Sequence, residues 1–197
     1  MTDYVDGYCE RVGPGLWGEP LNSLSNLAFL VAAVLVWRLA DGDRTGRLLA
    51  GLIGLIFVAS SAFHLLATRW AAVADSVAIL VFVLVYAVLF AREHWRPRHA
   101  WLAAPGFLAL TVVTALLGGG LYLGALIGLA AFAAVLAFER DAYWTHFAVA
   151  GAVFALSLSL RTLDRDVCGY VPVGTHFLWH LLNGVVLYLV SRALLRP

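Results

Sequence analysis

Three histidines lie within the most apolar stretches of this chain. His64 closes one hydrophobic run (GLIGLIFVASSAFHLL), while His176 and His180 open another (THFLWHLLNGVVLYLV). An ionisable side chain at membrane depth is costly, so it usually marks a functional site. The i, i+4 spacing of His176 and His180 places both imidazoles on one face of a helix. Three neutral imidazoles can hold zinc and leave its fourth position open, which is typical of a catalytic metal site.

Two other interpretations of the histidines stay open at this point. The three side chains could be unrelated residues near membrane interfaces, each hydrogen-bonded to backbone or water. Two of them could instead be axial haem ligands on facing helices. The shared face of His176 and His180 disfavours haem, and a third histidine at matching depth would be surplus.

Asp75 and Ser60 are the next candidates. Asp75 lies near the start of a third apolar run (WAAVADSVAILVF) and needs a partner, which a metal-bound water or a metal-ligating histidine would supply. It could equally be a helix N-cap or a first-turn acid. Ser60 precedes His64 by one helical turn, so its hydroxyl could donate to an oxyanion near the metal. Serine is also common as a hydrogen-bonding group between membrane helices.

The composition indicates an integral membrane protein. Of the 197 residues, 62% are hydrophobic and only 13% are charged, and the mean hydropathy is +0.88. A soluble domain carries about a quarter charged residues. The net charge of +1 gives no reason to expect nucleic acid as a partner. The chain has no lysine, which excludes a retinal protein with a Schiff base. Its first 21 residues lack the pattern of a signal peptide.

Hydrophobic runs bounded by charges predict an all-α fold, a bundle of seven transmembrane helices in a single domain, 1–197. An outer N-terminal segment, 1–20, precedes the helical bundle, 21–197. Each run approaches the roughly 20 residues that cross a bilayer core. The predicted helices are 21–40, 46–67, 72–92, 100–117, 120–138, 143–160 and 174–192. Three consecutive glycines, 118–120, make the boundary between the fourth and fifth the weakest.

The arginines predict the orientation in the membrane. With the N-terminus outside and the C-terminus inside, nine arginines fall on the cytoplasmic side and four on the outer side, as the positive-inside rule requires. His64, Asp75 and His176 then all fall toward the outer leaflet. This convergence is independent of the spacing of the histidines, so it supports a common site.

Several motifs together resemble the alkaline ceramidase family. They are YCE in the N-terminal segment, EPLNSLSNL entering the first helix, Ser60-x3-His64, Asp75 eleven residues later, and His176-x3-His180. The resemblance covers essentially the whole chain. The family belongs to a wider superfamily of seven-helix hydrolases that includes the adiponectin receptors.

The resemblance implies zinc on His64, His176 and His180, with Asp75 as acid/base and Ser60 as oxyanion stabiliser. It also implies a ceramide-like membrane lipid as substrate, with its amide bond hydrolysed to a fatty acid and a sphingoid base. The alternative is a lipid-binding or receptor protein, similar to the adiponectin receptors, that keeps the zinc site with little turnover.

The same resemblance raises the possibility of calcium in the N-terminal segment. Members of the family bind calcium there through an aspartate, glutamates and an asparagine. Glu10 and Glu19 match that pattern, and Asp6 lies one residue from the aspartate position, where this chain has Gly7. Val12 stands in place of the asparagine. Oxygen ligands of this kind suit a hard cation.

The two cysteines, Cys9 and Cys168, both fall in outer segments of the predicted topology. The exclusive use of arginine, the abundance of alanine and the short loops suggest a bacterial inner-membrane protein whose active site faces the periplasm. Disulfides persist in that compartment, so we expect a Cys9–Cys168 bond, which the resemblance to ceramidases also favours. Two unpaired thiols are the alternative.

Overall fold

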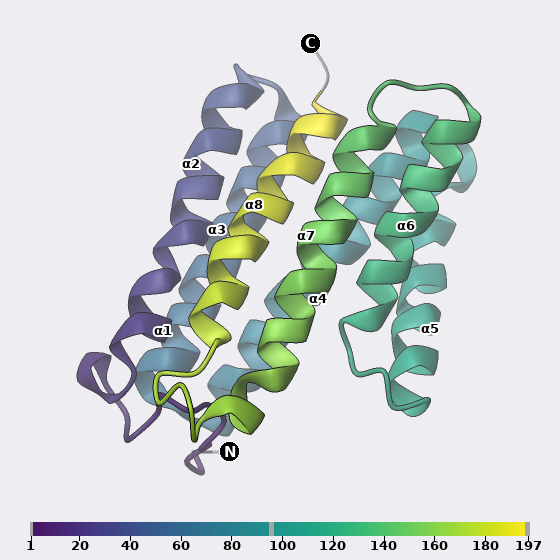
Figure 1. The fold of residues 1–197 in the computed structure, drawn as a ribbon. Coiled ribbons are helices and arrows are strands. Elements are labelled where there is room, and N and C mark those ends of the chain that lie inside the picture. The colour runs from purple at the N-terminus through teal and green to yellow at the C-terminus, as the bar shows by residue number, and fades with distance from the viewer. Residues whose placement is uncertain (1, 95–96, 196–197) are drawn as a thin grey trace.

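The computed structural model describes residues 2–94 and 97–195, and the regular elements in this range are all helices, apart from an isolated bridge between Tyr4 and Thr68 (Figure 1). The predicted all-α class is therefore confirmed. The α-helices are α1 (Pro20–Ser25), α2 (Leu27–Ala40), α3 (Arg44–Leu66), α4 (Arg69–His94), α5 (Ala103–Leu116), α6 (Leu123–Phe138), α7 (Trp144–Leu163) and α8 (His176–Leu194). Short 3-10 turns precede α1 and α5 and follow α7, at Leu16–Gly18, Pro97–Leu102 and Asp164–Val167.

Six helical segments of the described chain are long and apolar enough to cross a bilayer, which makes this a multi-pass membrane protein. They are Pro20–Ala40, Arg44–Leu66, Arg69–His94, Pro97–Leu116, Trp144–Val167 and His176–Leu194. Helix α6 is equally apolar but has 16 residues, and so spans about 24 Å of a core that is about 30 Å thick. All seven predicted hydrophobic segments are thus helical, and six of them reach spanning length.

The glycine run explains why α6 begins at Leu123 rather than at the predicted residue 120. Gly118 and Gly120 have φ values of 84° and 71°, in the left-handed region that favours glycine. The chain reverses at these glycines between α5 and α6. Gly120, which the hydrophobic pattern assigns to the next helix, therefore belongs to the turn.

The helices form a closed ring in chain order. Each helix from α2 to α8 packs against the next, and α8 returns to pack against α2 and also touches α3 (Figure 1). The buried core of the ring includes Val36 of α2 and Ile53 of α3. Aromatic side chains such as Phe90, Phe132 and Phe147 fill the part between α4, α6 and α7. The ring brings α3 beside α8, although more than a hundred residues separate them.

The N-terminal segment lies across the end of the bundle where α8 begins (Figure 1). The backbone of Val5 donates to Ala67, that of Gly15 donates to Leu65, and that of Arg69 donates to Asp3. A disulfide joins Cys9 to Cys168, which confirms the predicted pairing. The segment is therefore fixed over the histidine end of the bundle by both covalent and hydrogen bonds.

Candidate metal centre

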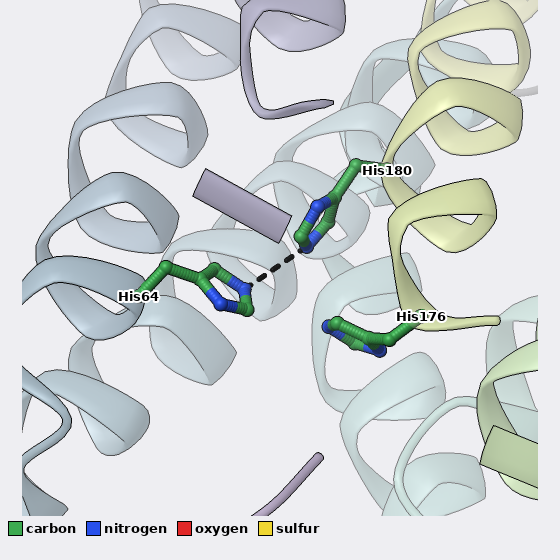
Figure 2. Close-up of side chains that lie close together, drawn as sticks. All are labelled: His64, His176 and His180. Carbon is green, nitrogen blue, oxygen red and sulfur yellow. Dashed lines mark hydrogen bonds between the residues drawn. The ribbon is translucent and has the colours of Figure 1, made fainter. Parts of the chain in front are cut away.

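His64 of α3 and His176 and His180 of α8 point toward one another from facing helices (Figure 2). All three are buried, and one nitrogen from each lies within 4.8 Å of the other two. The Nε2 atoms of His64 and His180 are 3.1 Å apart. In the described part of the chain, this is the one group of three or more histidine, cysteine or acidic side chains with ligand atoms this close together.

Two local features set the positions of these imidazoles. Helix α3 ends just after His64, where Ala67 adopts a left-handed conformation (φ 50°). At the start of α8, the carboxylate of Asp164 accepts hydrogen bonds from the backbone N–H groups of Thr175 (2.6 Å) and His176 (2.9 Å). A carboxylate at this point satisfies free helix N–H groups and complements the helix dipole. Asp164 also accepts from the backbone of Cys9, at 2.9 Å, which ties α8 to the N-terminal segment.

The outer nitrogens of two of the histidines contact oxygen atoms. Nδ1 of His64 lies 3.0 Å from a carboxylate oxygen of Glu19. Nδ1 of His180 lies 2.7 Å from the hydroxyl of Ser25, which itself donates to the carbonyl of Asn22 at 3.0 Å. Metal-ligating histidines commonly donate their second ring N–H to a carboxylate or another oxygen, which fixes the ring's orientation and tautomer.

These contacts favour one tautomer for each of His64 and His180. A carboxylate can only accept, so the 3.0 Å contact with Glu19 favours a proton on Nδ1 of His64. The single hydroxyl proton of Ser25 goes to Asn22, so Ser25 accepts from Nδ1 of His180. Both Nε2 atoms then present lone pairs to each other at 3.1 Å. Two facing lone pairs repel, and a cation bound by both removes the repulsion. The arrangement can therefore hold a metal ion.

Arg11 stabilises the charged form of the Glu19 carboxyl. The guanidinium of Arg11 forms an ion pair with Glu19, its Nε donates to the same carboxylate at 2.5 Å, and both side chains are fully buried. Burial raises the pKa of the Glu19 carboxyl, while Arg11 and Asn22 act in the opposite direction. Because arginine stays protonated in proteins, its buried cation requires the Glu19 carboxylate.

Aromatic rings close the site on the side of the N-terminal segment. The ring of Tyr8 stacks on His176, with centroids 3.6 Å apart and an angle of 18° between the planes. Burial raises the pKa of the Tyr8 hydroxyl, so it stays protonated at neutral pH. The Arg11 guanidinium carbon lies 4.5 Å from the centroid of the Phe63 ring and 5.2 Å from that of Tyr8. The disulfide-bound segment thus covers the histidines directly.

The structure brings Asp75 and Ser60 together. Their side chains hydrogen-bond to each other, and Ser60 and the Oδ1 atom of Asp75 are buried. Helix α4 begins at Arg69, so Asp75 lies in its second turn and is neither an N-cap nor a first-turn acid. The capping interpretation of Asp75 is therefore wrong. Asp75 is also close enough to Tyr8, which stacks on His176, to act on it electrostatically.

The three acidic residues considered for calcium have different partners. Glu10 accepts from the backbone N–H groups of Leu21 and Asn22, each at 2.8 Å, and so caps α1 from a distance. Glu19 is engaged by Arg11, and Asp6 is a half-exposed side chain 3.9 Å from Arg165. Calcium binding by these residues stays a prediction, because no observation tests it.

An apolar cavity of about 660 Å³ is lined by α4, α5, α6, α7 and α8, and its lining includes Ser76, which directly follows Asp75. Most of its lining is aliphatic and aromatic. Its polar residues include Ser76, which follows Asp75 on α4, and Tyr122, which is hydrogen-bonded to Ser76. A cavity of this kind suits the hydrocarbon chain of a lipid, with its polar end toward Asp75.

Some residues of the site carried no signal in the sequence. Ser25 and Asp164 act through hydrogen bonds that only the fold creates, and Tyr8 and Arg11 belong to a segment without hydrophobic periodicity. Asp164 follows α7 and lies twelve residues before the helix that it caps, so no spacing pattern indicates its role.

No protein-family model and no curated protein matches this chain.

Proposed function

We propose that this protein is a zinc-dependent amide hydrolase that cleaves ceramide or a related N-acyl lipid within the membrane. The observation that carries the proposal is the convergence of three buried histidines, with the Nε2 atoms of His64 and His180 3.1 Å apart. Two nitrogens bound tetrahedrally to one zinc at 2.0–2.1 Å stand about 3.3 Å apart. The donor set therefore fits zinc, with His176 as the third ligand. The motifs shared with alkaline ceramidases support the same assignment.

When bound, zinc supplies a Lewis acid that polarises an amide carbonyl and lowers the pKa of a water toward neutrality. The chain supplies the proton transfers. Asp75 takes a proton from the attacking water and returns it to the leaving amine. In the resting site Ser60 donates its hydroxyl proton to Asp75. Once Asp75 is protonated, that hydroxyl becomes free to donate to the oxyanion that develops on the carbonyl.

The cavity between α4 and α8 would hold the acyl chain. Its lining runs along α4 from Arg69 to Tyr86, a length of about 26 Å at 1.5 Å per residue. Because Ser76 and Tyr122 lie at its polar end, a chain bound there places the amide next to Asp75 rather than at the opposite end of the bundle.

We further propose seven membrane crossings, with α6 as the shortest, the N-terminus outside and the C-terminus inside. In a bacterial inner membrane the site would then face the periplasm. The distribution of arginines supports this orientation, and so does the Cys9–Cys168 disulfide at the histidine end, because disulfides persist in the oxidising compartment.

The test is turnover by purified full-length protein loaded with zinc. Incubation with a panel of N-acyl lipids that includes ceramide should release free fatty acid, and chelation of the metal should stop the release. A protein that binds about one zinc per chain and binds these lipids without releasing fatty acid is instead a lipid-binding or receptor protein, and the hydrolase proposal fails.

A further inference from the structure

Arg161 contacts one ring that lines the apolar cavity and another that adjoins the histidine site. It belongs to the last turn of α7, and its guanidinium carbon is 4.9 Å from the centroid of the Tyr122 ring and 5.5 Å from that of Trp179. Tyr122 lines the cavity, and Trp179 directly precedes His180. Arg161 also acts electrostatically on Asp75 and Tyr8. The positive charge therefore faces the place where the polar end of a bound lipid would lie.

This guanidinium has no carboxylate partner among residues 2–94 and 97–195. Two other arginines near this end of the bundle do contact an acid. Arg11 is paired with Glu19, and Arg165 lies 3.9 Å from Asp6. Arg161 acts on Asp75 electrostatically, but the side chain of Asp75 is hydrogen-bonded to Ser60. A partly buried charge without a partner is costly, and an anionic ligand would lower that cost.

The position of Arg161 constrains where such an anion sits in a substrate. The acyl chain occupies the cavity and the amide lies at the metal, so a group that reaches Arg161 belongs to the amine side of the amide. In an N-acyl amino acid the carboxylate is two bonds from the amide nitrogen, which keeps it close to the amide. Guanidinium and carboxylate form strong paired hydrogen bonds.

We propose that Arg161 binds a carboxylate on the amine side of the scissile amide, so that the preferred substrates are N-acyl amino acids. This inference rests on the amide hydrolysis proposed above. In the reaction, the oxygen of water joins the acyl carbon, the C–N bond breaks, and the amine leaves with a proton. The products are a fatty acid and a free amino acid.

The test compares two substrates that share an acyl chain and differ at one group. N-Oleoylglycine carries a carboxylate where N-oleoylethanolamine carries a hydroxymethyl group. The wild-type protein should hydrolyse the glycine conjugate with a kcat/KM about 10- to 100-fold higher, the range expected for one hydrogen-bonded charge pair. Equal values, or a preference for the ethanolamide, would overturn the inference while leaving amide hydrolysis in place.

The variant Arg161→Gln should lower the ratio of the two kcat/KM values to near one, and Arg161→Lys should keep an intermediate ratio because it retains the charge. Arg165→Gln is the matched control, since it removes an exposed arginine four residues away and should leave the ratio unchanged. A structural role for Arg161 would instead lower both kcat/KM values together with the ratio preserved. The wild-type comparison decides the question even if a variant does not fold.

Two further measurements separate this inference from other outcomes. Arg161 could bind the carboxylate of the fatty-acid product. In that case oleate would inhibit hydrolysis of both substrates, Arg161→Gln would relieve the inhibition, and the substrate ratio would stay near one. If neither amide is hydrolysed, thermal stabilisation by the intact lipids still tests the inference. Stronger stabilisation by N-oleoylglycine that Arg161→Gln removes supports the carboxylate site, and equal stabilisation by both lipids overturns it.

Discussion

The two sides of the helical ring differ in what they bury. The side formed by α1, α2, α3 and α8 encloses polar side chains: Asn22, Ser25, Asn26, Ser60, His64, His176, His180, Asn183 and Ser191. The side formed by α4 to α7 surrounds the apolar cavity. Its few buried hydroxyls, such as those of Thr114 and Ser157, are bonded to backbone carbonyls.

The two sides also differ in the open volume that they leave for a ligand. On the polar side, α8 approaches the start of α2 so closely that a Cβ added at Gly184 would lie 3.0 Å from both the Cβ and the carbonyl oxygen of Ala28. On the other side, Ala125 faces open volume in the cavity. Each polar group on the first side needs one particular partner, whereas the cavity needs mainly the right shape. We therefore expect substitutions on the first side, and at Asp75 where α4 meets it, to change the chemistry, and substitutions along the cavity to change ligand choice.

The largest effect should come from the histidines. His176→Ala or His180→Ala removes one of three ligands, so the content of about one zinc per chain should fall to nearly none. His99→Ala, in the exposed turn before α5, is the control and should keep the metal. Elemental analysis of purified protein measures this. Full zinc content in His180→Ala would show that the metal lies elsewhere.

Substitution of Asp75 should lower the rate of hydrolysis without loss of the metal. Asp75→Asn removes the proton acceptor and leaves all three histidines, so hydrolysis should fall by about 10²- to 10⁴-fold with zinc retained. Ser60→Ala should cost about 10²-fold, since one oxyanion donor is lost. Release of fatty acid and metal content, measured on the same samples, give both values. A wild-type rate in Asp75→Asn would mean that another group is the base.

Ser25 should affect the zinc affinity although it is not a ligand. Ser25→Ala leaves Nδ1 of His180 without its 2.7 Å contact, so zinc affinity should fall by about 10- to 100-fold. Ser23→Ala is the matched control on the same helix, because its buried hydroxyl has no partner in the described chain. Competition with a chelator measures both. Identical affinities in the two variants would contradict an orienting role for Ser25.

The smallest effect should lie on the cavity side. Ala125→Phe places a ring in the cavity and should lower the kcat/KM for an 18-carbon chain relative to a 12-carbon chain by roughly 3- to 10-fold, a low value for discrimination by an apolar pocket. Ala130→Phe, at an exposed position of α6, should leave the chain-length ratio unchanged. A change in metal content in Ala125→Phe would show that the two sides of the ring are not independent.

The parts of this site that were predictable are those in regular helices. The apolar runs located the helices, and the i, i+4 spacing placed His176 and His180 on one face before α3 and α8 were known to be neighbours. Helical periodicity relates residues within one turn and leaves the contacts of irregular segments unspecified. Tyr8 and Arg11 could not be found in this way.

The surroundings of two residues could not be read from the sequence. Asp75 matched the pattern of a first-turn acid only because the start of α4 was placed at residue 72 instead of Arg69. Arg161 entered the sequence argument as a charge to be counted on one side of the membrane, although its contacts with Tyr122 and Trp179 depend on packing between α7, α8 and the start of α6. The first depends on a helix boundary and the second on the packing of neighbouring helices.

The wide separation of the ligands in the chain has a consequence for biogenesis. His64 enters the membrane with the second long helix, whereas His176 and His180 arrive only with the last one. Cys9 likewise lacks its disulfide partner until Cys168 has been synthesised. A nascent chain can therefore hold neither the metal nor the disulfide until α8 has been inserted. Until then, the Glu19–Arg11 pair alone can satisfy the polar groups around His64, and a chain that stops before α8 should be recognised as unfinished by membrane proteases.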